Sequence, residues 1–493
     1  MDGAEPKPTT LARALRIGVS VLPWLPMLLF PGLLVSLWKL ALVIPYQLDY
    51  GEAEVLHSAI RMVCGESIYP AMGGYPYVNT PYPPLYIALC AAALRLTGPG
   101  LLLGRLISMV SGAAVLCFAA AIVWRETRSR LAAALAPALL LSVGFFDYWI
   151  MLMRVDALAL ALSMLGLLLA LRRRHVAAAL VFAAAICTRQ SALAAPAAVI
   201  LTLALERRWR DALRFAIVLA VPVLIVFAAV MLATRGWFYA HAFTVLARHA
   251  WDWSNLPMQM GRVARYWPAL AALGLAISVW TLVRGAARTM GLYFLISAAV
   301  SISVAKIGAS FNYFLEPFAA ACVLIGVACG VTQRAWFQSA RARLAGVALA
   351  LVLAAQLFAM AFGFVALMHK HILQPFSPPD EQIVFQRILG TKGDILCEDY
   401  SLLDLAGRPV LLEPFEFTRM VRAGLVDPTP VLADIQRRRF ALIVMRLDPE
   451  TFPYAGPNED VGISGWYGPL VNEIRANYRL REEHLLYYLL VPR

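Results

Sequence analysis

Long apolar runs recur along most of this 493-residue chain and constrain its fold more than any other feature. A helix needs about 20 apolar residues to cross the hydrocarbon core of a bilayer, and such runs follow one another from residue 17 to residue 367. The composition agrees, because 61% of the residues are hydrophobic and only 15% are charged, which is far from a soluble globular protein. The sequence therefore predicts an all-α polytopic membrane domain.

Basic residues between the runs predict how the chain is oriented. Arg13 and Arg16 precede the first run, and loops rich in Lys and Arg stay in the cytoplasm, so residues 1–16 are predicted to be cytoplasmic. The later basic loops lie at 125–130, 172–175, 206–210, 284–288 and 334–343. If the short apolar stretch 84–96 crossed the membrane, these loops would all fall outside. We therefore expect 84–96 to be a surface or re-entrant helix on the outer side.

The remaining runs give about eleven predicted transmembrane helices, with the C-terminal part outside. Their approximate positions are 17–44, 101–124, 131–147, 155–171, 176–188, 191–205, 212–234, 267–284, 289–306, 313–331 and 344–367. The transmembrane domain is thus predicted over 17–368, with a large first outer loop at 45–100. The net charge of +13 is spread over short loops and forms no continuous basic face, which argues against nucleic-acid binding.

From about residue 369 the charge density becomes ordinary, and short strand and helix patterns alternate. We predict a small soluble α/β domain over 369–493 on the outer face. Its strands are expected at 394–397, 410–412, 440–444 and 486–491. Its helices are expected at 431–439 and 470–484. No phosphate-binding glycine loop, HExxH motif or nucleophile elbow is present in it, so we expect it to cap the membrane domain rather than carry chemistry.

Unusual polar residues gather at the predicted outer ends of the spans. Three acids, Asp49, Glu52 and Glu54, directly follow the first span. The other candidates are Tyr82 and Tyr86 in an aromatic–proline run, Arg154 and Asp156, Arg189 and Gln190, and Lys306, Asn312, Tyr313 and Glu316. Ionisable groups at the edge of a membrane domain are functional candidates, because burying them unpaired costs several kcal/mol.

Simpler readings of these residues stay open. Arg154 and Asp156 can form an ordinary interfacial ion pair, and Glu52 or Glu54 can be a solvated acid in the first turn of a helix, where the helix dipole favours it. The functional reading assigns outward carboxylates to a general base or to a divalent cation such as Mg²⁺ or Mn²⁺. Arg154, Arg189 and Lys306 then bind phosphate. Because no nucleotide sugar is available at the outer face, this combination indicates transfer from a lipid phosphate.

The chain resembles the GT-C superfamily of membrane glycosyltransferases, in particular the bacterial branch of protein mannosyltransferase-like and aminoarabinose transferase-like enzymes. The similarity covers about residues 15–370. It is carried by the acid cluster 49–54, Pro83-Pro84-Leu85-Tyr86, Arg105-Leu106, Met153-Arg154-Val155-Asp156, Thr188-Arg189-Gln190-Ser191 and Asn312-Tyr313-Phe314-Leu315-Glu316. The family often has a lysine directly before its Pro-Pro-Leu element, and this chain has Tyr82 at that place, so the resemblance leaves phosphate binding to Arg154, Arg189 or Lys306.

The resemblance implies an inverting glycosyltransferase of the bacterial cytoplasmic membrane, using a polyprenyl-phosphate-linked sugar as donor and a lipid or glycan as acceptor. It implies Asp49 as catalytic base or metal ligand, with Glu52 as second choice. Asp156 is the corresponding second acid, with Asp147 as its alternative. Two other functions are weighed against it: a transporter or flippase of lipid-linked sugars, and a non-catalytic envelope scaffold.

Overall fold

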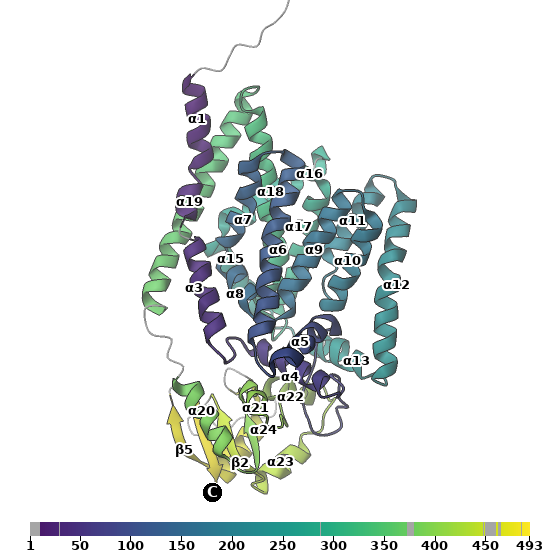
Figure 1. Cartoon of the computed structure of the whole chain (residues 1–493), viewed down its shortest axis with the longest axis vertical. Coiled ribbons are helices and arrows are strands. Elements are labelled where there is room, and N and C mark those ends of the chain that lie inside the picture. The colour runs from purple at the N-terminus through teal and green to yellow at the C-terminus, as the bar shows by residue number, and fades with distance from the viewer. Residues whose placement is uncertain are drawn as a thin grey trace, which may run out of the picture.

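A computed structural model describes residues 10–28, 30–285, 287–371, 379–446, 448, 460–461, 465–484 and 486–493. A helical bundle extends to His371, and a smaller α/β domain begins at Pro379 (Figure 1). Helix α1 (Thr10–Val21) lies at the end of the bundle farthest from the α/β domain. Residues 1–9 of the predicted cytoplasmic N-terminus are outside the described residues.

Every predicted span contains helix, although several are broken. The bundle comprises α1, α2 (Trp24–Met27), α3 (Phe30–Val43), α6 (Leu102–Thr127), α7 (Arg130–Leu141), α8 (Gly144–Met151), α9 (Val155–Leu171), α10 (His175–Thr188), α11 (Ala194–Leu205), α12 (Trp209–Ala233), α15 (Asn255–Tyr266), α16 (Pro268–Arg284), α17 (Arg288–Val300), η2 (Ser301–Ala305), η3 (Phe311–Phe314), α18 (Leu315–Ala335) and α19 (Ala340–His371). The short segments α13 (Trp237–Tyr239), η1 (Ala240–Val245) and α14 (Leu246–Arg248) connect α12 to α15.

The number of membrane-crossing helices is smaller by length than the sequence predicts. Among the described residues, five helices are long and apolar enough to cross a membrane, or up to seven if two bent pairs each form one span. The bent pairs are α7–α8, with 76° between the axes, and α15–α16, with 97°. Proline at the start of α16 explains part of the second bend, because it has no N–H to continue the preceding helix. The predicted count of eleven is not confirmed, since α9, α10 and α11 are apolar but shorter.

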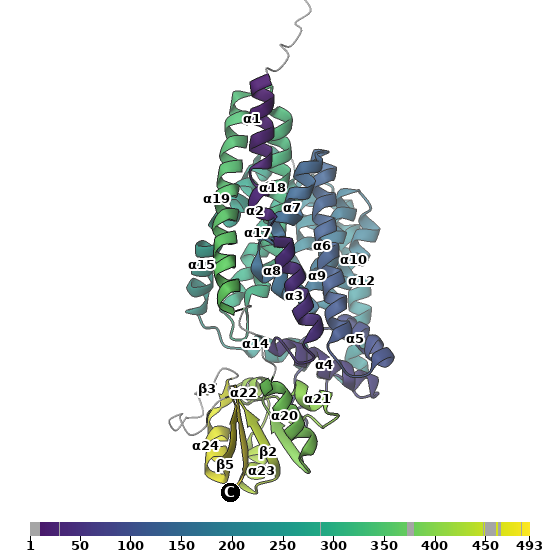
Figure 2. The same cartoon turned by 60° about the vertical axis from the view of Figure 1, so that its left-hand side comes forward.

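The first outer loop forms two helices at the end of the bundle nearest the α/β domain (Figures 1 and 2). They are α4 (Tyr50–Val63) and α5 (Pro84–Thr97). The predicted helix at 84–96 is therefore present, and it is too short to span a bilayer. Asp49 caps α4 by accepting a hydrogen bond from Gly51 N over 3.0 Å, as short acidic side chains do at helix N-termini.

The C-terminal domain is built on a four-stranded sheet of order β1-β2-β6-β5, in which β1 and β2 are parallel and the other neighbours antiparallel. Its strands are β1 (Asp394–Cys397), β2 (Phe440–Met445), β5 (Tyr478–His484) and β6 (Tyr487–Pro492), with β3 (Asp460–Val461) and β4 (Trp466–Tyr467) as a separate pair. Its helices are α20 (Pro379–Gly390), α21 (Ser401–Leu405), α22 (Pro414–Arg422), α23 (Thr429–Gln436) and α24 (Gly468–Asn477).

Two sequence expectations for this domain are wrong in part. The predicted helix 470–484 ends at Asn477, and the chain continues as the edge strand β5. Charged side chains on the outward face of β5 made this segment look like the polar face of a helix in the sequence. The predicted strand 410–412 forms no named strand. Leu412 instead makes an isolated parallel bridge to Tyr77 of the first outer loop.

That bridge helps to dock the C-terminal domain on the first outer loop. Tyr77 N donates to Leu411 O over 2.8 Å, and Glu413 N donates to Tyr77 O over 3.0 Å. A second link joins His57 Nδ1 and Asp404 Oδ1, 3.0 Å apart and both buried. Buried polar groups are costly unless they are paired, so these contacts fix the domain in one position over α4.

Candidate active site

A cavity of about 600 Å³ lies between the bundle, the first outer loop and the C-terminal domain. Its lining is unusually rich in ionisable side chains for a chain of this composition. From the bundle and outer loop come Glu54, Tyr82, Arg154, Arg189, Gln190, Lys306, Asn312 and Tyr313, and from the C-terminal domain come Glu398, Asp399, Phe415, Glu416 and Arg446. The cavity therefore collects most of the predicted substrate-binding residues in one place.

Arg154 is the centre of the polar network in the cavity wall. It precedes α9, and its guanidinium donates to Asp49 Oδ1 over 2.5 Å, to Asp156 Oδ2 over 3.3 Å and to the Tyr82 hydroxyl over 3.2 Å. It also lies over the ring of Trp149, 4.7 Å from the centroid. A guanidinium held on several sides in this way presents a fixed positive charge to the cavity.

Asp156 connects Arg154 to a second arginine. Its Oδ1 lies 3.2 Å from Arg189 Nη1 and accepts from Asn312 Nδ2 over 3.1 Å. The sequence left open whether Arg154 and Asp156 form a mere interfacial pair. The structure shows instead a partly buried chain of ion pairs that runs Asp49–Arg154–Asp156–Arg189. The two arginines line the cavity, whereas Asp49 and Asp156, which bind them, are not among the lining residues.

Gly51 makes the approach of Arg154 to α4 possible. A Cβ atom at this position would lie 1.9 Å from Arg154 Nη1, far inside van der Waals contact. The absence of a side chain thus lets the guanidinium rest against the first turn of α4, next to the cap residue Asp49.

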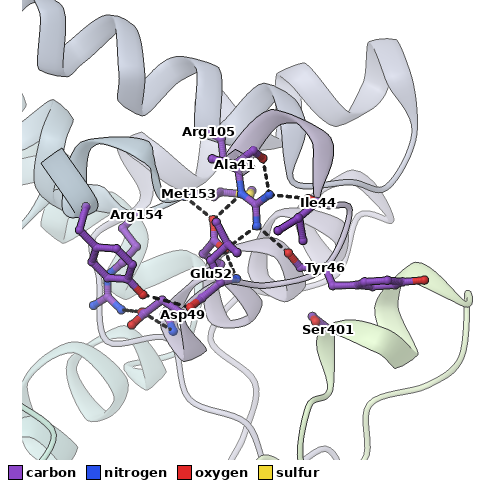
Figure 3. A network of polar contacts seen from close by, with 12 residues as sticks. Ala41, Ile44, Tyr46, Asp49, Glu52, Arg105, Met153, Arg154 and Ser401 are labelled. Carbon is purple, nitrogen blue, oxygen red and sulfur yellow. Dashed lines mark hydrogen bonds and ion pairs between the residues drawn. The ribbon is translucent and has the colours of Figure 1, made fainter. Parts of the chain in front are cut away.

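Glu52 is held in a buried ion pair with Arg105. Its carboxylate is fully buried and takes Arg105 Nε and Nη2, each at 2.8 Å, in a bidentate pair (Figure 3). It also accepts from Leu48 N over 2.7 Å and Met153 N over 2.8 Å. With both oxygens fully buried and held by four donors, Glu52 is not positioned to serve as the second-choice base.

The remaining predicted residues divide into two groups. Gln190 binds the carbonyl oxygens of Pro81 and Ala242 through Nε2, and Lys306 Nζ donates to Leu246 O over 3.2 Å; both line the cavity. Tyr86 and Glu316 do not line it. Tyr86 is fully buried, and its hydroxyl bonds to Gly104 O and Ser108 Oγ, which joins α5 to α6.

The two predicted metal ligands are already occupied by protein donors. Asp49 accepts from Arg154 and from its own helix, and both oxygens of Asp156 face an arginine. Among the residues described, no group of three or more His, Cys, Asp or Glu side chains is arranged to hold a metal ion. This donor set does not fit a resident divalent cation.

Sequence reasoning missed the residues that the C-terminal domain contributes. Glu398 and Asp399 directly follow β1, and Arg446 directly follows β2. The carboxyl ends of neighbouring parallel strands meet at one edge of a sheet, where sites commonly form, so this position was a usable signal. Burial raises the pKa of Asp399 to about 6. The domain is thus part of the cavity and more than the cap that we expected.

Glu54 was also undervalued, as a solvated acid in the first turn of α4. Its residue surface is only 7% exposed, and it lines the cavity. Burial, reinforced by the nearby Glu416 carboxylate, raises the pKa of Glu54 well above its usual range. The i, i+3 spacing from Gly51 was a sequence signal that both positions share one face of the helix.

Asp147, the alternative second acid, lies at a different place. It is fully buried in α8 and lines a second, mainly apolar cavity of about 700 Å³ bounded by residues of α3, α16 and α19. Neither of its carboxylate oxygens has a hydrogen-bond partner among the described residues. Its separation from Arg154 and Arg189 favours Asp156 as the acid that belongs to the candidate site.

Comparison with solved structures identifies this arrangement of helices and outer domain. ArnT from Cupriavidus metallidurans, crystallised with undecaprenyl phosphate, matches with a TM-score of 0.60 over 94% of this chain and 97% of that chain, at 16% sequence identity. The apo structure of the same enzyme matches with a TM-score of 0.54 over the same shares, at 15% identity. The chain has the GT-C glycosyltransferase fold.

The match extends through both parts of the molecule, so the C-terminal domain belongs to the GT-C arrangement here and is not an unrelated addition. No protein-family model and no curated protein sequence matches the chain. At 16% identity the likeness concerns the fold, and the roles of individual residues rest on the geometry described above.

Proposed function

We propose that this protein is a membrane glycosyltransferase that moves a sugar from a polyprenyl-phosphate-linked donor to an acceptor at the outer face of the bacterial cytoplasmic membrane. The observation that supports it best is a cavity lined by Arg154, Arg189 and Lys306, with the Asp49 carboxylate bound to the Arg154 guanidinium. An undecaprenyl-phosphate-binding enzyme of the same fold agrees with this reading. The orientation, with the N-terminus inside, follows from the basic loops.

In the proposed reaction, Arg154, Arg189 and Lys306 bind the donor phosphate. Arginine is suited to this because its planar fork can bind two phosphate oxygens at once. Lys306 has no acidic partner in the described contacts, and its ammonium lies 5.4 Å from the ring centroid of Trp251. The three charges then stabilise the phosphate as it leaves with the electron pair of the broken C1–O bond.

Asp49 is the proposed base. It takes the proton of the acceptor hydroxyl while that oxygen forms the new bond to C1 from the opposite face, which inverts the anomeric configuration. In the resting protein Asp49 is held by Arg154. A donor phosphate competes for the same guanidinium, so donor binding would release the Asp49 carboxylate for proton transfer only when the sugar is in place.

The test is a deletion strain complemented with the wild-type gene or with Asp49→Asn. We expect the deletion and the variant to accumulate one polyprenyl-phosphate sugar and to lose the corresponding sugar from an envelope glycan, as seen by mass spectrometry. Wild-type complementation should reverse both changes. Normal glycans with Asp49→Asn at wild-type protein levels would refute the role of Asp49, and unchanged lipids and glycans in the deletion would refute the proposed function.

Two further assignments stay predictions and need their own measurements. Transfer by purified protein before and after EDTA, with Mg²⁺ or Mn²⁺ restored, tests the divalent cation that the sequence suggested and that the arginine-bound carboxylates do not favour. Movement of a lipid-linked sugar across proteoliposomes without any acceptor would favour the flippase alternative.

A further inference from the structure

Two glutamates from distant parts of the chain face the same cavity. Glu54 belongs to α4 in the first outer loop, and Glu416 belongs to α22 in the C-terminal domain. Their residue surfaces are 7% and 5% exposed, and both line the cavity. The reaction proposed above uses neither of them.

Glu54 is buried without a partner. Its carboxylate makes no hydrogen bond or ion pair with any residue that the structure describes, whereas Glu52, two positions earlier, has four donors. A buried carboxylate without donors costs several kcal/mol. Because Glu54 lines the cavity, a molecule that enters it can supply the missing hydrogen bonds.

Glu416 is held rigidly but incompletely satisfied. Its Oε2 accepts from Asn79 Nδ2 over 2.9 Å and lies 3.7 Å from His249 Nε2. The neighbouring Phe415 packs edge-on against Tyr50 of α4, with ring centroids 5.8 Å apart. These contacts anchor the start of α22 over α4 and leave Glu416 Oε1 without a partner in the described contacts.

The position of Glu54 relative to Arg154 indicates what would reach it. Arg154 rests against Gly51, and Glu54 is three residues further along the same helix. Residues with this spacing lie on one face, about 5–6 Å apart. A phosphate on Arg154 would therefore place the group bonded to it beside Glu54, and in the proposed reaction this group is the sugar.

We propose that Glu54 and Glu416 form a carboxylate pair that binds hydroxyl groups of the sugar being transferred, so that the C-terminal domain forms part of the donor site. This inference rests on the proposed function. Burial and the charge of Glu416 raise the pKa of Glu54, so Glu54 can donate as well as accept a hydrogen bond, and Glu416 Oε1 can accept one. A sugar hydroxyl is itself donor and acceptor and matches such a pair.

Binding by the purified full-length protein tests the inference with two kinds of probe. One is undecaprenyl phosphate, and the other is undecaprenyl phosphate linked to glucose, mannose or galactose. We expect the wild type to bind at least one sugar-linked lipid more tightly than the phosphate alone. Glu54→Gln and Glu416→Gln should each weaken that binding about tenfold or more, because a charged hydrogen bond is lost, while undecaprenyl phosphate binds as before.

Glu413→Gln is the matched control. Glu413 is a buried glutamate at the same interface that accepts from Asn79 N over 3.4 Å and does not line the cavity. Its variant should keep the preference for the sugar-linked lipid. If Glu416→Gln disturbs folding in a thermal melt, Glu54→Gln decides alone, since its side chain has no described contact to lose.

A ligand-side comparison separates binding from structure. A deoxy form of the preferred sugar lipid should bind the wild type more weakly than the intact sugar lipid does. Its affinity should fall little further in Glu54→Gln, because the hydroxyl that Glu54 would bind is already missing. Equal loss of both probes in the variants, no loss in either, or no preference in the wild type would overturn the inference. A variant that keeps sugar-lipid binding but loses turnover would also overturn it and would make Glu54 the base. If the wild type binds none of the lipids, the proposed function itself fails.

Discussion

Replacing Arg105 with methionine should be among the most destabilising single changes in this protein. All five guanidinium donors of Arg105 are used: two on Glu52 and three on the carbonyl oxygens of Ala41, Ile44 and Tyr46, at 2.6–2.8 Å. Removing one partner of a buried ion pair costs about 3–5 kcal/mol, and each orphaned carbonyl adds about 1 kcal/mol. The total of about 6–8 kcal/mol is comparable to the whole stability of many proteins.

Two companion variants make this expectation specific. Arg105→Lys keeps the charge but offers only three donors, so it should be destabilised less than Arg105→Met. The double variant Glu52→Leu/Arg105→Met removes both buried charges and should recover about 3–5 kcal/mol relative to Arg105→Met, because apolar side chains replace a buried pair at little cost.

The assay is unfolding by increasing SDS in mixed micelles, followed by tryptophan fluorescence, with size-exclusion chromatography for folded yield. The expected order of unfolding midpoints is wild type, then Arg105→Lys and the double variant, then Arg105→Met. A midpoint for Arg105→Met equal to that of the wild type would refute the reasoning. So would a double variant less stable than Arg105→Met.

Three more expectations concern the cavity and its surroundings. Gly51→Ala should leave the unfolding midpoint nearly unchanged, since only the tip of the Arg154 side chain must move. It should lower the rate of sugar transfer by about 100-fold, because small misplacements in active sites have effects of this size. Normal transfer would contradict the role of the contact between Gly51 and Arg154. Asp156→Asn should lower transfer by a similar factor, about 100-fold, whereas Asp147→Asn should leave it unchanged, and the reverse result would reassign the second acid. Asp399 has a folded pKa of about 6 against an ordinary 3.8, so its contribution to the free energy of unfolding is present below about pH 4 and is lost as the pH rises through 6. Asp399→Asn should remove about 2–3 kcal/mol of this loss, as measured by unfolding curves between pH 4 and 7. An unchanged dependence of stability on pH would contradict the assignment.

The fold could be predicted well from the sequence because its dominant signal is local. Apolar runs and basic loops placed helix in every expected span, and the change of composition near residue 369 located a second domain. The breaks within helices were harder to predict from the sequence. The bend between α7 and α8 depends on how the helices pack, and an 18-residue hydropathy pattern looks the same whether the helix is straight or broken.

Most site residues of the bundle were predicted from the sequence, whereas Glu54 and the residues of the C-terminal domain were missed. Arg154, Arg189 and Lys306 stood out because charge is rare in apolar sequence. Glu416 lies in a domain of ordinary charge density, where one more glutamate carries no signal. The different environments of Glu52 and Glu54 could not be predicted from the sequence, because they depend on tertiary contacts. Arg105 forms an ion pair with Glu52, whereas no described residue forms one with Glu54.

The docking of the C-terminal domain on Tyr77 has a consequence for biogenesis. The segment that pairs with this residue, 411–413, is synthesised only after every helix of the bundle has left the ribosome. A nascent chain can therefore occupy the membrane with its arginines in place while the chamber still lacks its outer wall. Lipid phosphates can reach the basic side of such an intermediate, but the wall that the C-terminal domain contributes to the cavity forms only when translation ends and this domain docks on the first outer loop.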